Sequence, residues 1–441
     1  MKRLLIQTQL SNYTSDGKFV LEADSGWQMC INRAREMLKL VPDLCIDIMG
    51  PWRDEDDMDG MGQLVTHPYE VNRDLWDNHG PNGDKRLGYV PHWIVPNALA
   101  TRYDFDFDTL ARALNLSKHS DSPDMRYDVV YINDPMLLRN FKALFFLKGG
   151  YQPKFAVHSH FIDDPSAPKF PKEASLWLGQ CEAAIRADYN FWQCESAMNV
   201  FFKEFGEFFN QDVVNYVKEK SKPADDGFSL EETKTFDVNK MRFTPEEFKQ
   251  KVGDRIVVFF PNRISPSSGD YTNGCKFMFE MLPELRKNRQ DFVVIAGNPN
   301  LKYTNTELEE KCGQNGYVSI VADTLRRDEF KFVANNSHIA VGLYDKDSYG
   351  GTAARECIEL GCLPLWIDKY EYSTISRTAS NYPYVGKPDF SDTVKMLSVL
   401  IEHCKIYGRN SPWGAPLRRV VKRRCSYEHT VPEMIQLMGL C

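Results

Sequence analysis

Short apolar runs and segments with helical spacing alternate along the first part of the chain. Residues 3–9 begin with a run rich in Leu and Ile that predicts a buried strand, and a polar loop containing Gly17 and Gly26 follows. Between residues 27 and 40 apolar positions recur at helical spacing, and Pro42 ends this helix before another apolar run at 44–49. The order predicts a β-loop-α-β unit.

Predicted strands and helices alternate again after a long irregular segment. Residues 50–100 are rich in Pro, Gly, Asn and acidic side chains, which predicts a solvated loop. Two strands are then predicted at 128–135 and 155–160, and helices at 137–147, 175–186, 197–205 and 213–220. The polar stretch 221–254 predicts the junction to a second domain.

A second series of strands and helices follows the junction. Strands are predicted at 255–260, 291–296, 318–322, 339–343 and 363–367, and helices between them at 276–285, 306–312, 328–334 and 352–360. This rhythm is typical of a doubly wound parallel sheet, which binds ligands at the carboxyl ends of its strands. The fold class expected for the whole chain is therefore α/β, with two Rossmann-like domains facing a cleft.

Composition narrows the class of protein. The 441 residues are 42% hydrophobic and 26% charged, which excludes a disordered chain, and the net charge of −7 argues against a basic coat for nucleic acid. No run of eighteen apolar residues predicts a membrane segment, and the first residues turn polar too early for a signal peptide. The eleven cysteines include no CxxC pair, so reduced thiols and a cytoplasmic location are expected.

A glycine turn leads directly into the helix predicted at 352–360. Gly350, Gly351 and Thr352 would present unpaired N–H groups at its N-terminus, where the partial positive charge suits a diphosphate. Glu356 lies about one turn further along, where a carboxylate accepts hydrogen bonds from sugar or ribose hydroxyls. A helix that binds no ligand is the alternative interpretation.

Two basic residues follow the strand predicted at 255–260. Arg263 lies just beyond its end, where a fixed guanidinium can bind phosphate through two hydrogen bonds and neutralise a leaving diphosphate. Lys276 would add a second positive charge. A surface ion pair is the alternative interpretation for both residues.

A pair of histidines ends the strand predicted at 155–160. His158 and His160, with Asp163 shortly after them, could supply a general base or orient an acceptor hydroxyl. Strand alternation puts both histidines on one face, but no third ligand at useful spacing is evident, so no metal is predicted. A buried structural histidine is the alternative.

Five of the seven residues at 418–424 are basic. They could contact nucleic-acid phosphate or anionic lipid. They could equally form the solvated face of a helix whose apolar residues Leu417, Val420 and Val421 pack inward.

Taken in order, these segments resemble the retaining nucleotide-sugar glycosyltransferases of GT-B architecture. Asn262-Arg263 and Asn273-Gly274 resemble a Gly-Arg-like turn followed by Lys-Gly, and a strand with a glycine turn follows at Gly297. The family's pair of glutamates around a Phe-Gly turn is represented by the run from Ser348 to Glu356. Asn273 replaces the family's lysine and Ser348 its first glutamate, so Lys276 and Asp347 are candidates to substitute for them.

The resemblance implies an assignment for each domain. Residues 1–235 would form an acceptor-binding domain, 236–405 a nucleotide-sugar-binding domain, and 406–441 helices that pack back on the first domain. A nucleotide-sugar co-substrate is implied, most simply a UDP-sugar, with no metal and no tightly bound cofactor. The donor-binding residues implied are Gly26, Arg263, Lys276, Gly297, Asp347, Ser348, Tyr349, Gly350, Gly351, Thr352 and Glu356.

Within this family, phage enzymes that glycosylate 5-hydroxymethylcytosine in DNA are similar in the stretch from His158 to Phe191 and in the run from Glu356 to Trp366. The resemblance implies double-stranded DNA containing a hydroxymethylated pyrimidine as the acceptor. A glycosyltransferase for surface polysaccharide or lipid-linked glycan is the alternative. A catalytically silent binding module is a second alternative, because of Asn273 and Ser348.

Overall fold

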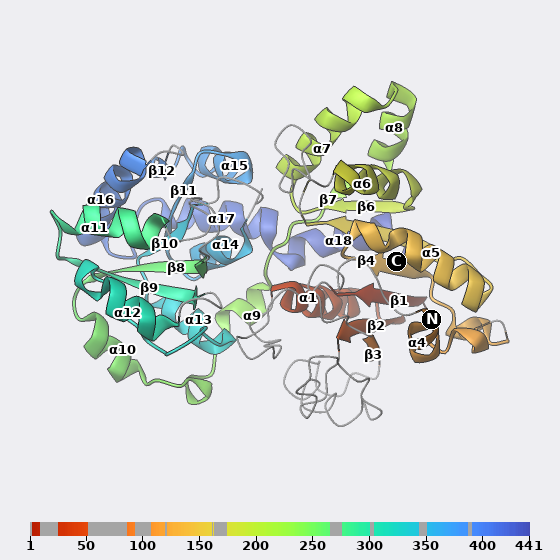
Figure 1. Cartoon of the computed structure of the whole chain (residues 1–441), viewed down its shortest axis with the longest axis horizontal. Helices are drawn as coiled ribbons and strands as arrows, with labels where there is room; N and C mark the ends of the chain where they lie inside the picture. Colours follow the sequence, from red (N-terminus) through yellow and green to blue (C-terminus); the bar gives the residue numbers. More distant parts are fainter. Residues whose placement is uncertain are drawn as a thin grey trace. The chain divides into compact units, whose positions relative to one another are not determined.

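The computed structural model describes residues 2–8, 25–51, 86–92, 107–119, 121–160, 162, 174–264, 276–299, 304–343, 351–386 and 390–441. The chain forms two compact units (Figure 1). Unit 1 comprises Met1–Asp225 and Thr430–Cys441, and unit 2 comprises Asp226–His429. Compared with the domains expected from the sequence, residues 226–235 and 406–429 lie in unit 2.

Unit 1 is built on a seven-stranded parallel sheet with the order β3-β2-β1-β4-β5-β6-β7. Its strands are β1 (Lys2–Gln7), β2 (Leu44–Pro51), β3 (Leu87–His92), β4 (Val129–Ile132), β5 (Lys154–Ser159), β6 (Tyr189–Trp192) and β7 (Ser221–Pro223). Strand β1 pairs with β2 on one side and β4 on the other. The strand order therefore reverses between β1 and β4, which is where doubly wound sheets bind ligands.

The helices of unit 1 connect these strands. They are α1 (Ser25–Leu40), α4 (Phe107–Ala113), α5 (Leu138–Leu144), α6 (Ala174–Arg186), α7 (Glu195–Phe208) and α8 (Gln211–Glu219), with short turns η2 (Leu116–Lys118), η3 (Pro123–Met125), η4 (Pro135–Leu137) and η5 (Phe145–Gly149). Helix α18 (Tyr427–Leu437) crosses the division of the chain at His429.

Unit 2 contains a five-stranded parallel sheet with the order β12-β11-β10-β8-β9. Its strands are β8 (Ile256–Ile264), β9 (Phe292–Pro299), β10 (Ile339–Gly342), β11 (Leu363–Ile367) and β12 (Val385–Gly386). Because β8 pairs with β9 on one side and β10 on the other, the order reverses between β8 and β10. A ligand site is expected at the carboxyl ends of these two strands.

The helices of unit 2 cover both faces of this sheet. They are α9 (Leu230–Lys234), α10 (Pro245–Val252), α11 (Leu282–Arg286), α12 (Asn305–Cys312), α13 (Arg327–Asn335), α14 (Thr352–Glu359), α15 (Tyr370–Thr378), α16 (Phe390–Tyr407) and α17 (Gly414–Cys425), with short turns η6 (Val238–Lys240), η8 (Phe277–Met281) and η9 (Gly313–Asn315).

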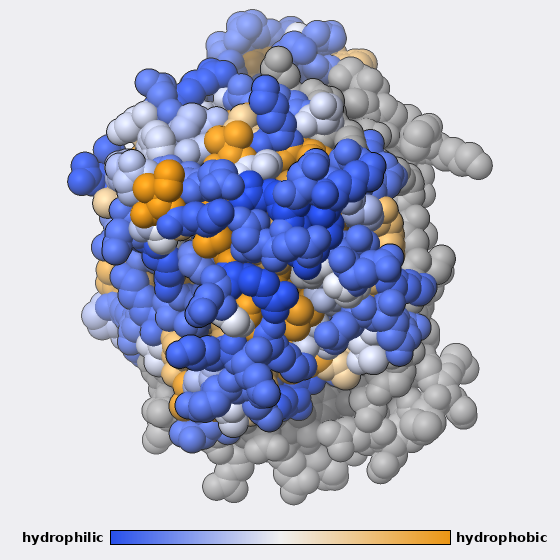
Figure 2. Space-filling view, turned by 90° about the vertical axis from the view of Figure 1, so that its left-hand side faces the viewer, coloured by the Kyte–Doolittle hydropathy of each residue, from blue (hydrophilic) through white to orange (hydrophobic). Residues whose placement is uncertain are grey.

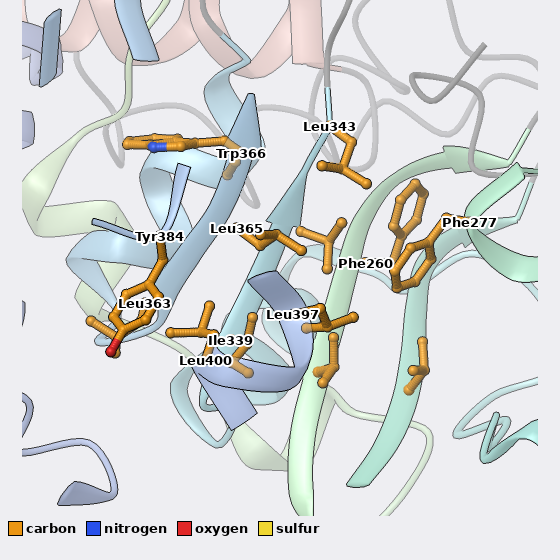
Figure 3. Close-up of a cluster of buried hydrophobic side chains, with 14 of the residues drawn as sticks. Phe260, Phe277, Ile339, Leu343, Leu363, Leu365, Trp366, Tyr384, Leu397 and Leu400 are labelled. Atoms are coloured by element: carbon orange, nitrogen blue, oxygen red, sulfur yellow. The ribbon is translucent and has the colours of Figure 1, made fainter. Parts of the chain in front are cut away.

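Successive residues of β8 enter two different cores, because neighbouring side chains in a strand point to opposite faces. Val258 and Phe260 join one cluster, and Val257 and Phe259 join the other. The first cluster also takes side chains from β10, β11 and α16, including Ile339, Leu363, Leu365, Leu397 and Leu400 (Figure 3). Burial on both faces explains why these strands read as continuous apolar runs.

The face of unit 2 in Figure 2 is mainly hydrophilic, with small separate apolar patches. None of the described helices is long and apolar enough to cross a membrane. The cysteines of the described ranges are free thiols. Burial raises the pKa of Cys181 and Cys404 to about 12, so these two thiols are protonated at neutral pH.

The structure corrects the sequence-based elements at the edges of the sheets. Strands β3, β7 and β12 were not predicted; two of them contain proline, and β12 has only two residues. Residues 318–322 were predicted as a strand but are irregular. The chain there makes one bridge, between Tyr317 and Val294, and then turns to hydrogen-bond elsewhere. The remaining strands and helices are confirmed.

Candidate functional site

Two of the sequence-predicted residues lie at the reversal point of unit 2. Arg263 is the eighth residue of β8, and Gly351 immediately precedes α14, which follows β10. Parallel strands end at the same edge of a sheet, so both residues belong to the edge where a ligand is expected. The side chain of Arg263 lies outside the described part of the chain, as do Asp163, Asp347, Ser348, Tyr349 and Gly350.

The first turn of α14 is fixed by hydrogen bonds within unit 2. Gly351 is the extended N-cap residue, and its N–H donates to the hydroxyl of the fully buried Tyr372. The Thr352 hydroxyl donates to the carbonyl of Asp226 at 2.5 Å. Arg355, also buried, donates to the carbonyls of Gly351 and Asp226 at 3.3 and 2.8 Å. The start of the helix is thus held in one geometry.

Glu356 is held in a buried ionic cluster. Its Oε1 accepts a hydrogen bond of 2.8 Å from Thr233, and its two oxygens pair with the guanidinium of Arg327. Arg327 also pairs with Glu232, and Lys331 lies 2.6 Å from the same carboxylate. Burial alone would raise the pKa of Glu232, but the charges of Arg327 and Lys331 outweigh it and lower that pKa to about 2. The side chain of Glu356 is fixed in position by its contacts with Thr233 and Arg327.

Three further predicted donor residues have different surroundings. Gly297 is buried near the end of β9, where a Cβ would lie 2.9 Å from the ring of Phe259, so a larger residue would not fit at this position. Lys276 caps the short turn η8. Gly26 belongs to α1 and therefore lies in unit 1, apart in the chain from the other donor residues.

In unit 1, His158 at the end of β5 is fully buried. Its Nδ1 lies 2.5 Å from the Tyr131 hydroxyl and 3.2 Å from a guanidinium nitrogen of Arg33. Arg33 extends from α1 and is also buried, and it donates to the carbonyls of Ala224 and Asp225 at 3.0 and 2.8 Å. A buried cation therefore lies next to His158.

His160 lies against His158 but has a separate set of partners. The two rings are stacked with their centroids 4.3 Å apart. His160 Nε2 lies 3.0 Å from Oδ1 of Asn133, which follows β4. Asn133 in turn donates two hydrogen bonds to Gln7 at the end of β1, from its main-chain N–H to Oε1 and from its Nδ2 to the main-chain carbonyl. The carboxyl ends of β1, β4 and β5 thus contribute to one polar cluster at the reversal point of this sheet.

Sequence reasoning did not name Arg33, Tyr131, Asn133 or Gln7. A signal for Arg33 exists, because it lies three residues after Cys30 and four before Met37, on the apolar stripe of its helix. Asn133 directly follows a buried strand, which is the position where functional residues were expected.

The basic segment forms α17. Leu417 and Val421 are buried, whereas Arg419, Lys422 and Arg423 are exposed. Arg424 pairs with the buried Glu371. This arrangement matches the solvated helix face considered from the sequence.

The chain is similar over its whole length to solved structures of low sequence identity. HepE from Anabaena in complex with UDP-glucose has 12% identity and a TM-score of 0.64, with 100% of both chains covered. Sucrose-phosphate synthase from Thermosynechococcus elongatus has 9% identity and a TM-score of 0.64, with 100% of this chain and 99% of that chain covered. A glycosyltransferase from Rickettsia africae has 10% identity and a TM-score of 0.61, with 100% and 98% covered.

No protein-family model and no curated protein matches the sequence. The likeness to the solved structures, together with the two parallel sheets, confirms the α/β fold class and the GT-B architecture of two Rossmann-like units.

Proposed function

We propose that this protein is a glycosyltransferase that moves a sugar from a UDP-sugar to a hydroxyl acceptor. The observation that carries the proposal is the whole-length likeness to HepE, whose structures hold UDP and UDP-glucose. It is supported by Arg263 and the start of α14, which belong to the reversal edge of unit 2.

In this proposal unit 2 binds the donor. The guanidinium of Arg263 and the N-terminal amides of α14 neutralise the diphosphate as the glycosidic bond breaks. Glu356, fixed by Arg327 and Thr233, accepts hydrogen bonds from ribose or sugar hydroxyls. The remaining donor contacts are assigned to Lys276, Gly297, Asp347, Ser348, Tyr349, Gly350, Gly351 and Thr352. No metal is required, because these groups supply the positive charge.

Unit 1 handles the acceptor, through His158, His160 and Asp163, and Gly26 allows close approach of a ligand. We assign the reaction to the retaining class. The acceptor oxygen forms its bond to the anomeric carbon on the face from which the diphosphate departs, and the leaving phosphate oxygen takes the acceptor proton. The acceptor assigned is a 5-hydroxymethyl pyrimidine in double-stranded DNA, which would need to leave the base stack to react.

Nucleoside mass spectrometry tests both levels of the proposal. The protein is incubated with mixed nucleotide sugars and DNA containing hydroxymethylcytosine, hydroxymethyluracil or neither. A hexose or pentose mass gain on one hydroxymethylated base supports the DNA acceptor, and NMR of the product gives the anomeric configuration. Donor turnover without a mass gain on DNA would indicate that the acceptor is a polysaccharide or lipid-linked glycan. No turnover with any nucleotide sugar leaves a binding module and refutes the proposal.

Replacing Arg263 tests the neutralisation of the diphosphate. We expect Arg263→Gln to lower kcat by about 100-fold or more, with a smaller effect on KM, because the missing charge matters most when the bond breaks. The control is Lys287→Gln, which removes an exposed cation paired with Glu284 in the same unit. Steady-state rates against UDP-glucose concentration measure both effects, and equal losses in the two variants would refute this role of Arg263.

A further inference from the structure

The outward face of α17 carries positive charge in a stretch of the chain that has no acidic residue. Residues 406–427 include six basic and no acidic side chains, although acidic residues outnumber basic ones in the whole chain, 61 to 54. Arg419, Lys422 and Arg423 are exposed, and Arg418 is half-buried. These four residues form the basic face of α17.

The acidic residues on the two helices that pack against α17 already have partners. These helices are α14 and α15 (Figure 1). Glu356 and Glu359 of α14 form ion pairs with residues of α13 and α9. Glu371 of α15 pairs with Arg424, the one basic residue of this segment of α17 that turns toward a neighbouring helix. Within the described ranges, none of these three carboxylates neutralises the basic face.

The spacing of the basic face is unfavourable for an isolated helix. Arg418 and Lys422 are four residues apart, as are Arg419 and Arg423, and like charges at this spacing repel each other. The dipole of the helix favours cations in its last turn, but Arg418 and Arg419 lie before that turn. A bound polyanion would relieve the repulsion along the whole face.

Helix α17 runs antiparallel to α14 and ends at the carboxyl edge of the unit 2 sheet. Arg409, which precedes α17, donates to the carbonyl of Leu360 at the end of α14. At the other end of α17, Sγ of Cys425 accepts a hydrogen bond of 3.3 Å from Arg355 in the first turn of α14. The last residues of the basic face therefore lie on the side of unit 2 to which the sugar donor is assigned.

We propose that the basic face of α17 binds the phosphate backbone of duplex DNA beside the carboxyl edge of unit 2. The inference rests on the proposed function, because it gives the DNA acceptor a surface on unit 2. Contacts from arginine and lysine to phosphate position a duplex without reading its sequence. From Arg418 to Arg423 the helix advances about 7.5 Å, which spans about two base steps of one strand.

The surroundings of the basic face favour a nucleic acid over a lipid bilayer. A helix that lies on a membrane buries large apolar side chains among the lipids. Between residues 408 and 429, all of which the structure describes, no large apolar side chain is exposed. Three of the four cations are arginines, whose guanidinium binds phosphate through two parallel hydrogen bonds.

Binding of unmodified duplex DNA tests the surface without any transfer of sugar. Fluorescence anisotropy of a labelled duplex of about 20 base pairs gives the Kd of the full chain between about 50 and 200 mM NaCl. Four phosphate contacts predict that log Kd rises with log salt concentration with a slope of about 3 to 4. A triple variant with Arg419→Gln, Lys422→Gln and Arg423→Gln should weaken binding at about 50 mM salt by about 100-fold or more and lower this slope by about 3.

The matched control is a triple variant with Lys240→Gln, Lys249→Gln and Lys287→Gln. These lysines are exposed in unit 2, and their loss changes the net charge by the same amount. Because they lie outside α17, we expect the Kd of this control to stay within about threefold of wild type.

Two further variants separate charge from folding. Arg419→Lys combined with Arg423→Lys keeps the charge of the basic face, so it should retain most of the affinity and the salt slope. Circular dichroism and Tm show whether the triple variant of α17 folds, and its Tm should not fall because repelling pairs are removed. Lys422→Gln alone, with an expected tenfold loss of affinity or about that, decides the matter if the triple variant fails to fold.

Equal losses in the two triple variants, or no binding of DNA by the wild-type chain, would overturn the proposal. Displacement of the DNA by UDP would also overturn it, because the DNA phosphates would then occupy the donor site. Vesicles of phosphatidylcholine and phosphatidylserine test the bilayer. If the wild-type chain binds these vesicles but not DNA, and the triple variant of α17 loses that binding, the face is a membrane surface and the proposal is wrong.

The failure of this inference is distinguishable from the failure of the proposed function. Sugar transfer to DNA with the same KM for DNA in wild type and in the triple variant of α17 refutes the role of the basic face and leaves the proposed function intact. DNA that binds to the basic face but receives no sugar refutes the DNA acceptor and leaves a nucleic-acid-binding surface.

Discussion

Gly227→Ala is expected to destabilise unit 2 by more than about 3 kcal/mol, because the added methyl group meets main chain that cannot move aside. An ideal Cβ at residue 227 would lie 1.5 Å from the carbonyl oxygen of Cys425 and 2.6 Å from its carbon. The same carbonyl accepts a hydrogen bond from the N–H of Phe228 at 3.2 Å, so relieving the clash also breaks this bridge. Urea unfolding followed by circular dichroism measures the loss.

Gly206→Ala is the control for this substitution. Gly206 lies on the exposed side of α7, and nothing lies within 4 Å of the position its Cβ would take. Alanine has the higher helix propensity, so this variant should be more stable by about 0.5–1 kcal/mol. Equal effects of the two substitutions would show that residues 226–228 do not pack against residue 425 as described.

Arg327→Met should lower the free energy of unfolding by about 3 kcal/mol. Breaking a buried ion pair leaves its partner uncompensated, and Arg327 serves two carboxylates, those of Glu232 and Glu356. Lys331 still neutralises Glu232 in the variant, so most of the loss falls on Glu356, whose side chain is 4% exposed. Thr233→Val, which removes one neutral donor from the same carboxylate, should cost about 1 kcal/mol.

The part of this loss that falls on Glu232 depends on pH. Its pKa is about 2 in the folded chain, below its ordinary value of 4.5. The group therefore stabilises the fold above its ordinary pKa, and this contribution is lost as the pH falls toward 2. In Arg327→Met the pKa of Glu232 moves part of the way back toward its ordinary value. The free energies of unfolding of wild type and variant should therefore differ most above about pH 5 and converge at lower pH. A difference independent of pH would contradict the ionic account.

The central strands could be predicted from sequence because burial on both faces leaves an uninterrupted apolar run, as in β11, whose bounds were predicted without error. Edge strands could not be predicted in this way, because one side of their backbone has no partner and proline is tolerated there, as at Pro91 and Pro223. Periodicity also misassigned residues 318–322 as a strand, because Val318, Ile320 and Val321 pack in the same core cluster as Val293 and Ile295 of β9.

Some residues of the candidate site could likewise be predicted from the sequence, and others could not. Gly351 could be predicted as a site residue because it precedes a helix, and His158 because it lies at the end of a buried strand. The partners of Glu356 could not be predicted, because Thr233 and Arg327 are 94 residues apart in the chain and meet only in the fold. Arg327 is engaged by two carboxylates, and neither of them lies near it in the chain. Tertiary pairing of charges leaves no local signal.

The order of the two units along the chain has a consequence for synthesis. Unit 2 lies between the two segments of unit 1 in the chain, so residues 430–441 leave the ribosome after all of unit 2. Residues 1–225 cannot complete unit 1 until those last residues have been synthesised. The two ends of unit 1 meet directly, with the amine of Lys2 donating to the carbonyls of Gly439 and Cys441 at 2.8 and 2.5 Å. A circular permutant that joins these ends and opens between Asp225 and Asp226 would make each unit continuous, so that unit 2 and then unit 1 could be completed in turn.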